Sequence, residues 1–166
     1  GDNANQNPIV SNYHTYMGAV YQGRYIAGIV AGMKLQEMIS EGKITPQDAK
    51  IGYVGAYAYA EVISGYTSFY LGVRSVVPEA VMTVKYTNTW SSYSTEKQAA
   101  KELVDEDCVV ISQHSDTVGP AAICENAQRD IPVYHVGYNQ SMTDIAPTRS
   151  LVSCCVDYSS YFEQSV

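Results

Sequence analysis

Residues 50–87 read KIGYVGAYAYAEVISGYTSFYLGVRSVVPEAVMTVKYT, and this stretch decides the fold. It opens with an apolar run, Lys50–Ala56, and closes with another, Ala80–Thr87, both of strand length. Between the two runs a helix is predicted from about Ala60 to Val76, ended by Pro78. A strand, a helix and a second strand at this spacing form a βαβ unit, in which the two strands lie parallel.

The alternation continues toward the C-terminus. Three more strands are predicted, at Cys108–Gln113, Pro132–Gly137 and Leu151–Val156. Helices are predicted around them: one capped by Ser94, one starting near Val118 and Pro120, and a last one starting at Ser159 or Ser160. Short apolar strands flanked by helices predict an α/β fold, with a parallel sheet of about five strands and helices on both faces.

A long helix, Gly18–Ser40, is predicted upstream of this unit, and it is rich in glycine. Gly23, Gly28 and Gly32 recur at helical spacings of four and five. Glycine weakens an isolated helix, but it lets another backbone approach closely. The remaining residues of the helix are largely apolar, so we expect its surface to be covered on more than one side.

The composition describes a compact protein and excludes some partners. Of the 166 residues, 46% are hydrophobic and 16% are charged, which favours a folded domain over a disordered chain. The formal net charge is -7. Nucleic acids and anionic membrane surfaces would repel such a chain, so neither is expected as a partner. No apolar stretch is long enough to span a bilayer.

The cysteines and carboxylates give no sign of a metal or a cofactor. Cys108, Cys124, Cys154 and Cys155 do not have the spacing of a zinc site, and we interpret them as buried free thiols. No paired carboxylates follow the strands in a way that would hold Mg²⁺. We therefore expect neither a metal nor a cofactor.

Aromatic and polar residues follow the predicted strands. The chain has 15 Tyr, 2 Phe and 1 Trp, and the ligands of an open parallel sheet bind beyond the carboxyl ends of its strands. Flat rings and directional hydrogen-bonding groups together suit an aromatic heterocycle. The candidate ligand-binding residues are the aromatic Tyr57 and Trp90, together with His114, Asp116 and Asn139.

Enzymatic and nucleotide-binding motifs are missing from these loops. IGYVGAYAYAE, at residues 51–61, is neither a G-x-G-x-x-G loop nor a P-loop. The chain has no G-x-S-x-G nucleophile elbow. His114 and Asp116 resemble a dyad, but the sequence places no nucleophile beside them. We therefore expect no catalytic residues and interpret the chain as a binding protein rather than an enzyme.

Several stretches resemble the basic membrane lipoprotein family of PnrA-like proteins. They are YMGAVYQGRYIAGIVAGM at 16–33, the segment 50–80 quoted above, VKYTNTW at 84–90, VVISQHSD at 109–116 and HVGYNQSM at 135–142. The match covers nearly the whole chain in the right order. It implies a type I periplasmic-binding-protein fold. It also implies an extracytoplasmic receptor of an ABC importer that delivers a purine nucleoside or base to permease subunits.

The resemblance also implies how the chain relates to a whole receptor. Residues 1–48 are expected to belong to an N-terminal lobe or hinge, and residues 49–166 to a truncated C-terminal lobe. A lipoprotein anchor is implied upstream, and the isolated fragment is expected to self-associate. By motif, the ligand contacts carry over to Tyr57, Trp90, His114 and Asp116. Where the family often has Asp, Asn139 keeps an acceptor, gains a donor and loses the charge.

Two alternatives come from other classes of protein. A flavodoxin-like FMN-binding electron carrier would fit the acidity, length and aromatic loops, although the hydroxyl-rich phosphate loop after the first strand is missing. A small hydrolase using His114 and Asp116 is the third interpretation. A flavin absorbance spectrum would support the first alternative, and turnover of nucleosides would support the second.

Overall fold

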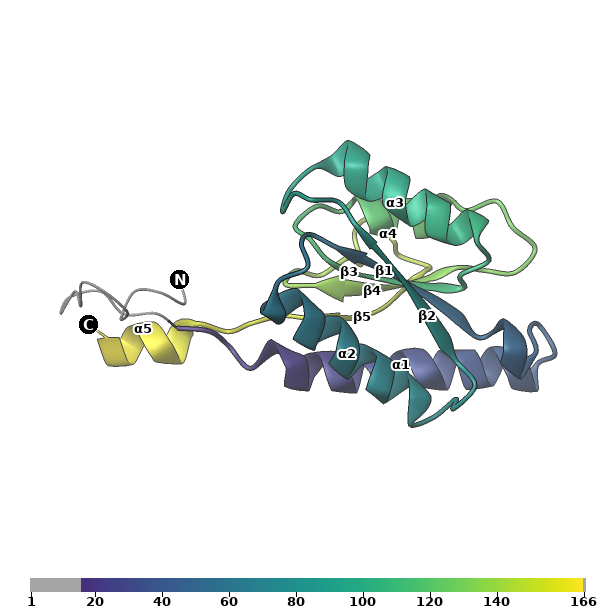
Figure 1. The fold of residues 1–166 in the computed structure, drawn as a ribbon, viewed down its shortest axis with the longest axis horizontal. Coiled ribbons are helices and arrows are strands. Elements are labelled where there is room, and N and C mark those ends of the chain that lie inside the picture. The colour runs from purple at the N-terminus through teal and green to yellow at the C-terminus, as the bar shows by residue number, and fades with distance from the viewer. Residues whose placement is uncertain (1–15, 166) are drawn as a thin grey trace. The chain divides into compact units, whose positions relative to one another are not determined.

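A computed structural model describes residues 16–165 of the chain (Figure 1). Its centre is a sheet of five parallel strands in the order β2-β1-β3-β4-β5. The strands are β1 (Lys50–Gly55), β2 (Val81–Tyr86), β3 (Val110–His114), β4 (Tyr134–Tyr138) and β5 (Ser150–Cys154). The predicted parallel α/β sheet of about five strands is confirmed.

Helices cover both faces of the sheet, as predicted (Figure 1). On one face lie α1 (Val20–Ser40) and α2 (Ala60–Arg74), and the loop that joins α1 to β1 includes a short 3-10 turn, Pro46–Asp48. On the other face lie α3 (Tyr93–Asp105) and α4 (Gly119–Asn126). Because both faces are covered, the central strands β1 and β3 are buried along almost their whole length.

Alternate residues of β1 enter two separate cores. Ile51 and Tyr53 pack with Phe69 under α1 and α2. Val54 points to the other face and packs with Leu103 of α3. This alternation is the period of two that a pleated strand imposes, and it determines which side chains enter each core.

The glycines of α1 allow the close helix packing that the sequence predicts. A Cβ atom placed on Gly28 would lie 2.1 Å from the Phe69 carbonyl oxygen of α2. A Cβ atom on Gly72 of α2 would lie 2.2 Å from the Tyr25 carbonyl oxygen of α1. Two helix backbones therefore touch at a point where any side chain would force them apart.

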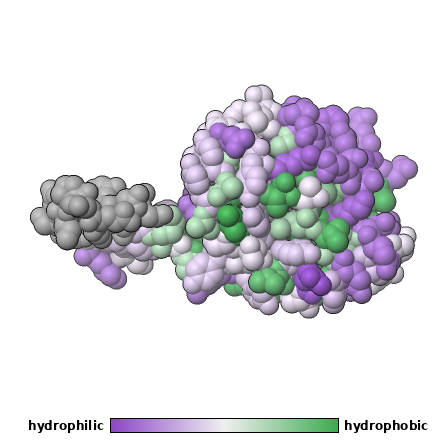
Figure 2. All heavy atoms as spheres, viewed as in Figure 1, coloured by the Kyte–Doolittle hydropathy of each residue, from purple (hydrophilic) through white to green (hydrophobic). Residues whose placement is uncertain are grey.

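The outer side of α1 differs from the prediction. α2 and β5 pack against the inner side, but Ile26 and Met33 are 62% and 61% exposed. The expected cover on more than one side is therefore missing within residues 16–165. On the face of the molecule shown in Figure 2, apolar side chains are scattered among polar ones, and strongly hydrophilic side chains gather over α3.

The start of α3 corrects the predicted cap. Ser92, not Ser94, is the N-cap, and its hydroxyl accepts a hydrogen bond from the Thr95 backbone N–H. The Glu96 carboxylate accepts one in return from the Ser92 backbone N–H at 3.1 Å. Two unpaired N–H groups at the helix start are thus satisfied. The prediction failed because Ser92 and Ser94 both have the side chain of a good N-cap.

The end of β5 corrects the prediction for the cysteines. The strand ends at Cys154, so Cys155 lies outside it and is exposed. Cys108 and Cys124 are buried and Cys154 is half-buried, all as free thiols. The expectation of buried thiols is therefore confirmed for Cys108 and Cys124 and wrong for Cys155.

The chain divides into two compact units. The larger, Val20–Cys155, holds the sheet and α1 to α4. In the smaller, the described residues are 16–19 and 156–165, which include α5 (Ser159–Ser165), and the Tyr16 ring stacks on Tyr161 with centroids 4.2 Å apart. Residues 1–15 lie outside the described part. The assignment of 1–48 and 49–166 to different lobes of a longer protein stays a prediction.

Candidate functional site

All five predicted ligand-binding residues lie at the carboxyl edge of the sheet. The Tyr57 and Trp90 rings have centroids 6.1 Å apart, and the Trp90 and His114 rings lie 6.2 Å apart. The Asp116 backbone N–H donates to the Trp90 carbonyl at 2.8 Å, which joins two of the loops. Asn139 and Asp116 line one hollow. The parallel topology brings the five residues together, and their contact with a ligand stays a prediction.

The hollow at this edge has a polar lining. It encloses about 320 Å³ between Asp116, Tyr138, Asn139 and Gln140. The Gln140 side-chain amide donates to the Asp116 carbonyl at 3.4 Å across it. Burial raises the pKa of the Asp116 carboxyl group above its ordinary value, and the nearby Glu96 charge acts in the same direction. The hollow therefore offers directional donors and acceptors to a small polar group.

Two asparagines shape the loops of this edge. Asn88 after β2 and Asn139 after β4 have φ angles of 56° and 57°. These left-handed conformations are open to Asn at lower cost than to most other residues with a side chain. The Asn139 backbone N–H also donates to the Cys154 carbonyl at 2.7 Å. The turn after β4 is thereby fixed to the end of β5.

Tyr59 adds an aromatic surface that was not among the predicted ligand-binding residues. Its ring stacks on Tyr57 at 4.9 Å with an interplanar angle of 12°, and the residue is 55% exposed. One face of Tyr57 is therefore covered by Tyr59. Two tyrosines separated by one residue after a strand were the signal available in the sequence. Together with the half-buried Trp90 they form an aromatic wall.

His114 lies behind this wall rather than on its surface. It ends β3, it has no exposed surface, and its ring contacts Tyr138 at 4.1 Å. Burial lowers the pKa of His114 to about 3, and the Arg24 charge acts in the same direction. The imidazole is therefore neutral at pH 7. A ligand would reach it only if a neighbouring side chain moved.

Arg24 of α1 is the buried residue that sequence reasoning missed. Its guanidinium donates to the Gly137 carbonyl at 3.0 Å and the Gln113 carbonyl at 3.1 Å, at the ends of β4 and β3. It also donates to the Tyr53 hydroxyl at 2.8 Å and the Ser112 hydroxyl at 2.6 Å. None of the ion pairs within residues 16–165 involves it. An arginine in the middle of a Gly-rich, apolar stretch of α1 was the available signal.

Glu96 holds the loop that carries Asp116. Its buried carboxylate accepts hydrogen bonds from the Ser115 hydroxyl at 2.8 Å and the Thr117 backbone N–H at 3.1 Å. The hydroxyl nearest to His114 in sequence is thus already used, and a histidine with a pKa near 3 is a poor general base. This geometry does not favour the hydrolase alternative.

The start of α2 does not favour a phosphate-bearing flavin. The first turn of α2 contains Glu61, and its carboxylate would repel a phosphate from the helix N-terminus. In the described part of the chain, no three histidine, cysteine or acidic side chains form a group that could hold a metal ion. No helix over residues 16–165 has both the length and the apolar character to cross a membrane.

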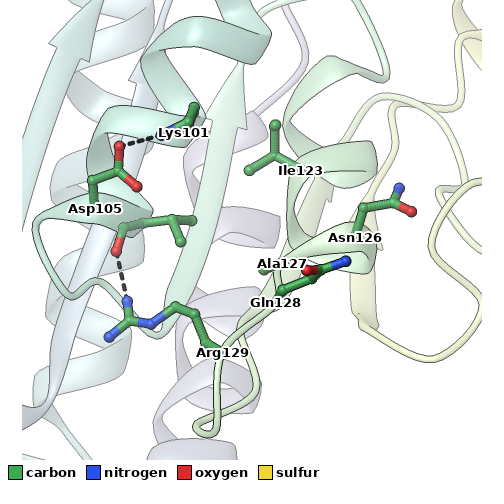
Figure 3. Close-up of a pocket in the computed structure, with 8 residues that line it drawn as sticks. Lys101, Asp105, Ile123, Asn126, Ala127, Gln128 and Arg129 are labelled. Carbon is green, nitrogen blue, oxygen red and sulfur yellow. Dashed lines mark hydrogen bonds and ion pairs between the residues drawn. The ribbon is translucent and has the colours of Figure 1, made fainter.

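A second hollow lies between α3 and α4, away from the carboxyl edge (Figure 3). It encloses about 270 Å³, with an apolar floor that includes Ile123. Its cations are engaged, because Lys101 pairs with Asp105 and Arg129 donates to the Val104 carbonyl at 2.6 Å. With no buried polar group directed into it, this hollow is not the candidate site.

Comparison with known proteins gives one family match. The Bmp family, described as ABC transporter substrate-binding protein PnrA-like, matches residues 2–166. A candidate ABC transporter glucose-binding protein of Haloferax volcanii is 35% identical over 151 residues. A purine-binding protein of Brucella abortus is 30% identical over 151 residues. Both alignments cover 91% of this chain but only 35% and 39% of the relatives, so the chain spans well under half of their length.

Two solved structures share the fold. An ABC transporter solute-binding protein of Conexibacter woesei aligns with a TM-score of 0.56 and 20% identity over 71% of this chain and 34% of its own. The arabinose-binding protein AraP of Geobacillus stearothermophilus aligns with a TM-score of 0.51 and 20% identity, over 74% and 41%. At this identity the likeness concerns the fold alone, and it confirms the predicted periplasmic-binding-protein architecture.

Proposed function

Because the chain belongs to the family of PnrA-like ABC transporter substrate-binding proteins, we propose that it forms part of an extracytoplasmic receptor for a purine base or nucleoside. The observation that carries the proposal is the juxtaposition of an aromatic wall and a polar hollow on one edge of the sheet. Tyr57, Tyr59 and Trp90 supply flat faces, and Asp116 and Asn139 supply the directional contacts. A heterocycle requires both kinds of surface.

A sugar is the competing ligand, because one relative is named for glucose binding and another for purine binding. The purine is favoured by the number of aromatic rings. Tyr57 and Tyr59 stack in nearly parallel planes, and Trp90 lies beside them, so the wall continues beyond one ring. A planar base can stack on such a wall, and each aromatic–base stack contributes about 1–3 kcal/mol to binding.

The whole receptor is proposed to work as a two-lobed clamp. Residues 49–166 form one lobe, residues 1–48 belong to the other lobe or to the hinge, and closure by hinge motion buries the ligand between them. The closed receptor delivers its ligand to the permease subunits of an ABC importer. A lipid anchor upstream attaches the receptor to the extracytoplasmic side of the cell membrane. The receptor itself binds without chemical change of the ligand.

The ligand can be identified directly. We expect mass spectrometry of the purified full-length protein to find a copurifying purine base or nucleoside. Titration calorimetry with adenosine, adenine and glucose should then show saturable binding of a purine and none of glucose. Saturable binding of glucose alone would overturn the purine assignment. Turnover of adenosine would overturn the non-enzymatic role.

A further inference from the structure

A buried hydrogen-bond chain begins at Arg24. A guanidinium is always protonated in proteins, so it only donates. One of its N–H groups donates to the Tyr53 hydroxyl oxygen at 2.8 Å. Burial raises the pKa of the Tyr53 hydroxyl, so the phenol keeps its own proton. That proton must point to another acceptor.

The acceptor beside Tyr53 is a ring nitrogen of His114. The Tyr53 hydroxyl lies 3.4 Å from His114 Nδ1. Gly65 of α2 makes room for this ring, because a Cβ atom there would lie 2.6 Å from Nδ1. Since the Tyr53 oxygen already accepts from Arg24, Tyr53 donates and Nδ1 accepts. A neutral imidazole whose Nδ1 accepts carries its proton on Nε2.

The Glu61 carboxylate lies beside His114 Nε2. Nε2 is buried, makes no hydrogen bond of good geometry, and lies 3.5 Å from Glu61 Oε1. His114 has no exposed surface, whereas the Glu61 side chain is 29% exposed. Of the two, only Glu61 can touch a ligand. The first turn of α2 also provides a positive helix terminus that favours a carboxylate.

We propose that Glu61 is a specificity-determining residue of the ligand site and that Arg24, Tyr53 and His114 are positioning residues that aim its carboxylate. The donors run in one direction, from Arg24 through Tyr53 and His114 to Glu61. Glu61 is then held as an acceptor facing the rim. It selects ligands that present an N–H or O–H group, and it disfavours ligands that present only acceptors there.

This inference rests on the proposed function and names the kind of ligand edge that the site selects. In a purine nucleoside the donor is either an amino or ring N–H of the base, or a ribose hydroxyl. Adenosine and adenine separate these sources, because adenine lacks the ribose. A Glu61→Gln change that weakens adenosine binding alone assigns the ribose hydroxyl. A change that weakens both assigns the base.

The test is a double-mutant cycle by titration calorimetry on the full-length protein with adenosine and adenine. Glu61→Gln replaces a charged acceptor, so we expect at least one probe to bind about tenfold more weakly, or worse. Tyr53→Phe removes only the hydroxyl and should weaken binding about threefold or more. In the Glu61→Gln background the Tyr53→Phe effect should disappear, because the chain acts through Glu61.

Tyr70→Phe is the matched control. The Tyr70 hydroxyl donates to the Ala80 carbonyl at 3.1 Å, at the opposite end of β2 from the rim. It should lower the melting temperature about as much as Tyr53→Phe but leave both dissociation constants unchanged. Unchanged binding by Glu61→Gln, or an equal Tyr53→Phe effect in both backgrounds, overturns the inference while the purine assignment stands.

A second measurement needs no ligand. Nitrogen-15 NMR of His114 at pH 7 should find a neutral ring with its proton on Nε2, and a shifted tautomer ratio in Tyr53→Phe. A proton on Nδ1 overturns the inference. Failure of both purines to bind the wild-type protein overturns the proposed function instead, and the NMR result then still decides the orientation of the chain.

Discussion

At the scale of single residues, two neutral histidines and one arginine share the interior beneath the ligand edge. Gln113 donates its amide to the Ser115 and Thr117 carbonyls, so its oxygen accepts from His135 Nε2 at 3.0 Å. Burial lowers the pKa of His135 to about 3, with Arg24 acting in the same direction, as for His114. Burial, reinforced by a fixed cation, thus keeps both rings uncharged at pH 7.

Because of these two buried histidines, we expect acid to lower the stability of the folded chain. Each has a folded pKa near 3 and an unfolded pKa near 6.5, so the unfolded chain binds more protons as the pH falls below 6.5. Stability is therefore full above pH 6.5 and declines toward pH 3. Between pH 7 and pH 5 we expect a loss of about 2 kcal/mol for each ring. Urea unfolding measured across this range checks the slope.

His135→Gln isolates one ring of the pair. It keeps an amide donor toward Gln113 and removes the titrating group, so the loss between pH 7 and pH 5 should shrink by about 2 kcal/mol. Above pH 7 the two proteins should show the same pH dependence, because neither histidine titrates there. A slope unchanged by the substitution would contradict the assignment.

A second prediction for a single residue concerns Trp90 and the affinity for the ligand. Its ring stands beside Tyr57 on the rim. Trp90→Ala in the full-length protein should weaken adenosine binding by about 1–3 kcal/mol, the contribution of one aromatic–base stack. Tyr93→Ala is the control, because Tyr93 is exposed at the start of α3. Equal affinities of the Trp90 variant and the wild type by titration calorimetry would contradict the proposal that Trp90 stacks on the ligand.

Residues such as Arg24 could not be assigned from the sequence. Its partners, Tyr53 and Gly137, are 29 and 113 positions away, and no local pattern encodes such a contact. Tyr57, Trp90 and Asp116 could be predicted because each follows the end of a strand, and parallel strands end at one edge. Sequence reasoning therefore predicted the loops that meet at this edge and the buried His114, but not the buried Arg24 behind them.

At the scale of elements, the strands were predictable and their limits less so. Short apolar runs between breakers mark all five strands. The fourth begins at Tyr134 rather than Pro132, because proline has no N–H for the ladder. The cap of α3 was misplaced by two residues, since Ser92 and Ser94 both have the right chemistry. Boundaries depend on contacts, whereas the alternation of elements does not.

Where α1 and α2 cross, we expect alanine to be less stabilising than glycine, the reverse of the usual order in a helix. Alanine normally favours a helix over glycine by about 1 kcal/mol. At Gly28 the new methyl group would meet a backbone oxygen at 2.1 Å, so Gly28→Ala should destabilise the chain by about 1–3 kcal/mol. Gly32→Ala should cost less, because its nearest backbone oxygen lies at 2.9 Å. Thermal unfolding measures both, and a stabilised Gly28 variant would refute the close crossing.

At the scale of the whole molecule, the apolar outer side of α1 predicts self-association of the 166-residue chain. Ile26 and Met33 are largely exposed, and tyrosines flank them. Burying such residues against a second copy removes apolar surface from water. Light scattering should report species larger than a monomer, and Ile26→Glu combined with Met33→Glu should restore the monomer.

Leu71→Glu is the matched control for this prediction. Leu71 is 56% exposed on α2, so its replacement adds a charge of the same sign to the same face of the sheet. It should leave the association unchanged if α1 is the contacting element. A monomeric wild-type chain at all concentrations would remove the basis of the prediction.

The central position of β1 bears on how a newly made polypeptide matures. β1 is flanked by β2, which follows it closely, and by β3, which begins only at Val110. Until the ribosome has passed His114, one side of β1 offers bare amide and carbonyl groups, which are a template for aggregation. Pairings so distant along the chain also form slowly. The nascent protein therefore has a vulnerable interval in which a holding chaperone would be most useful.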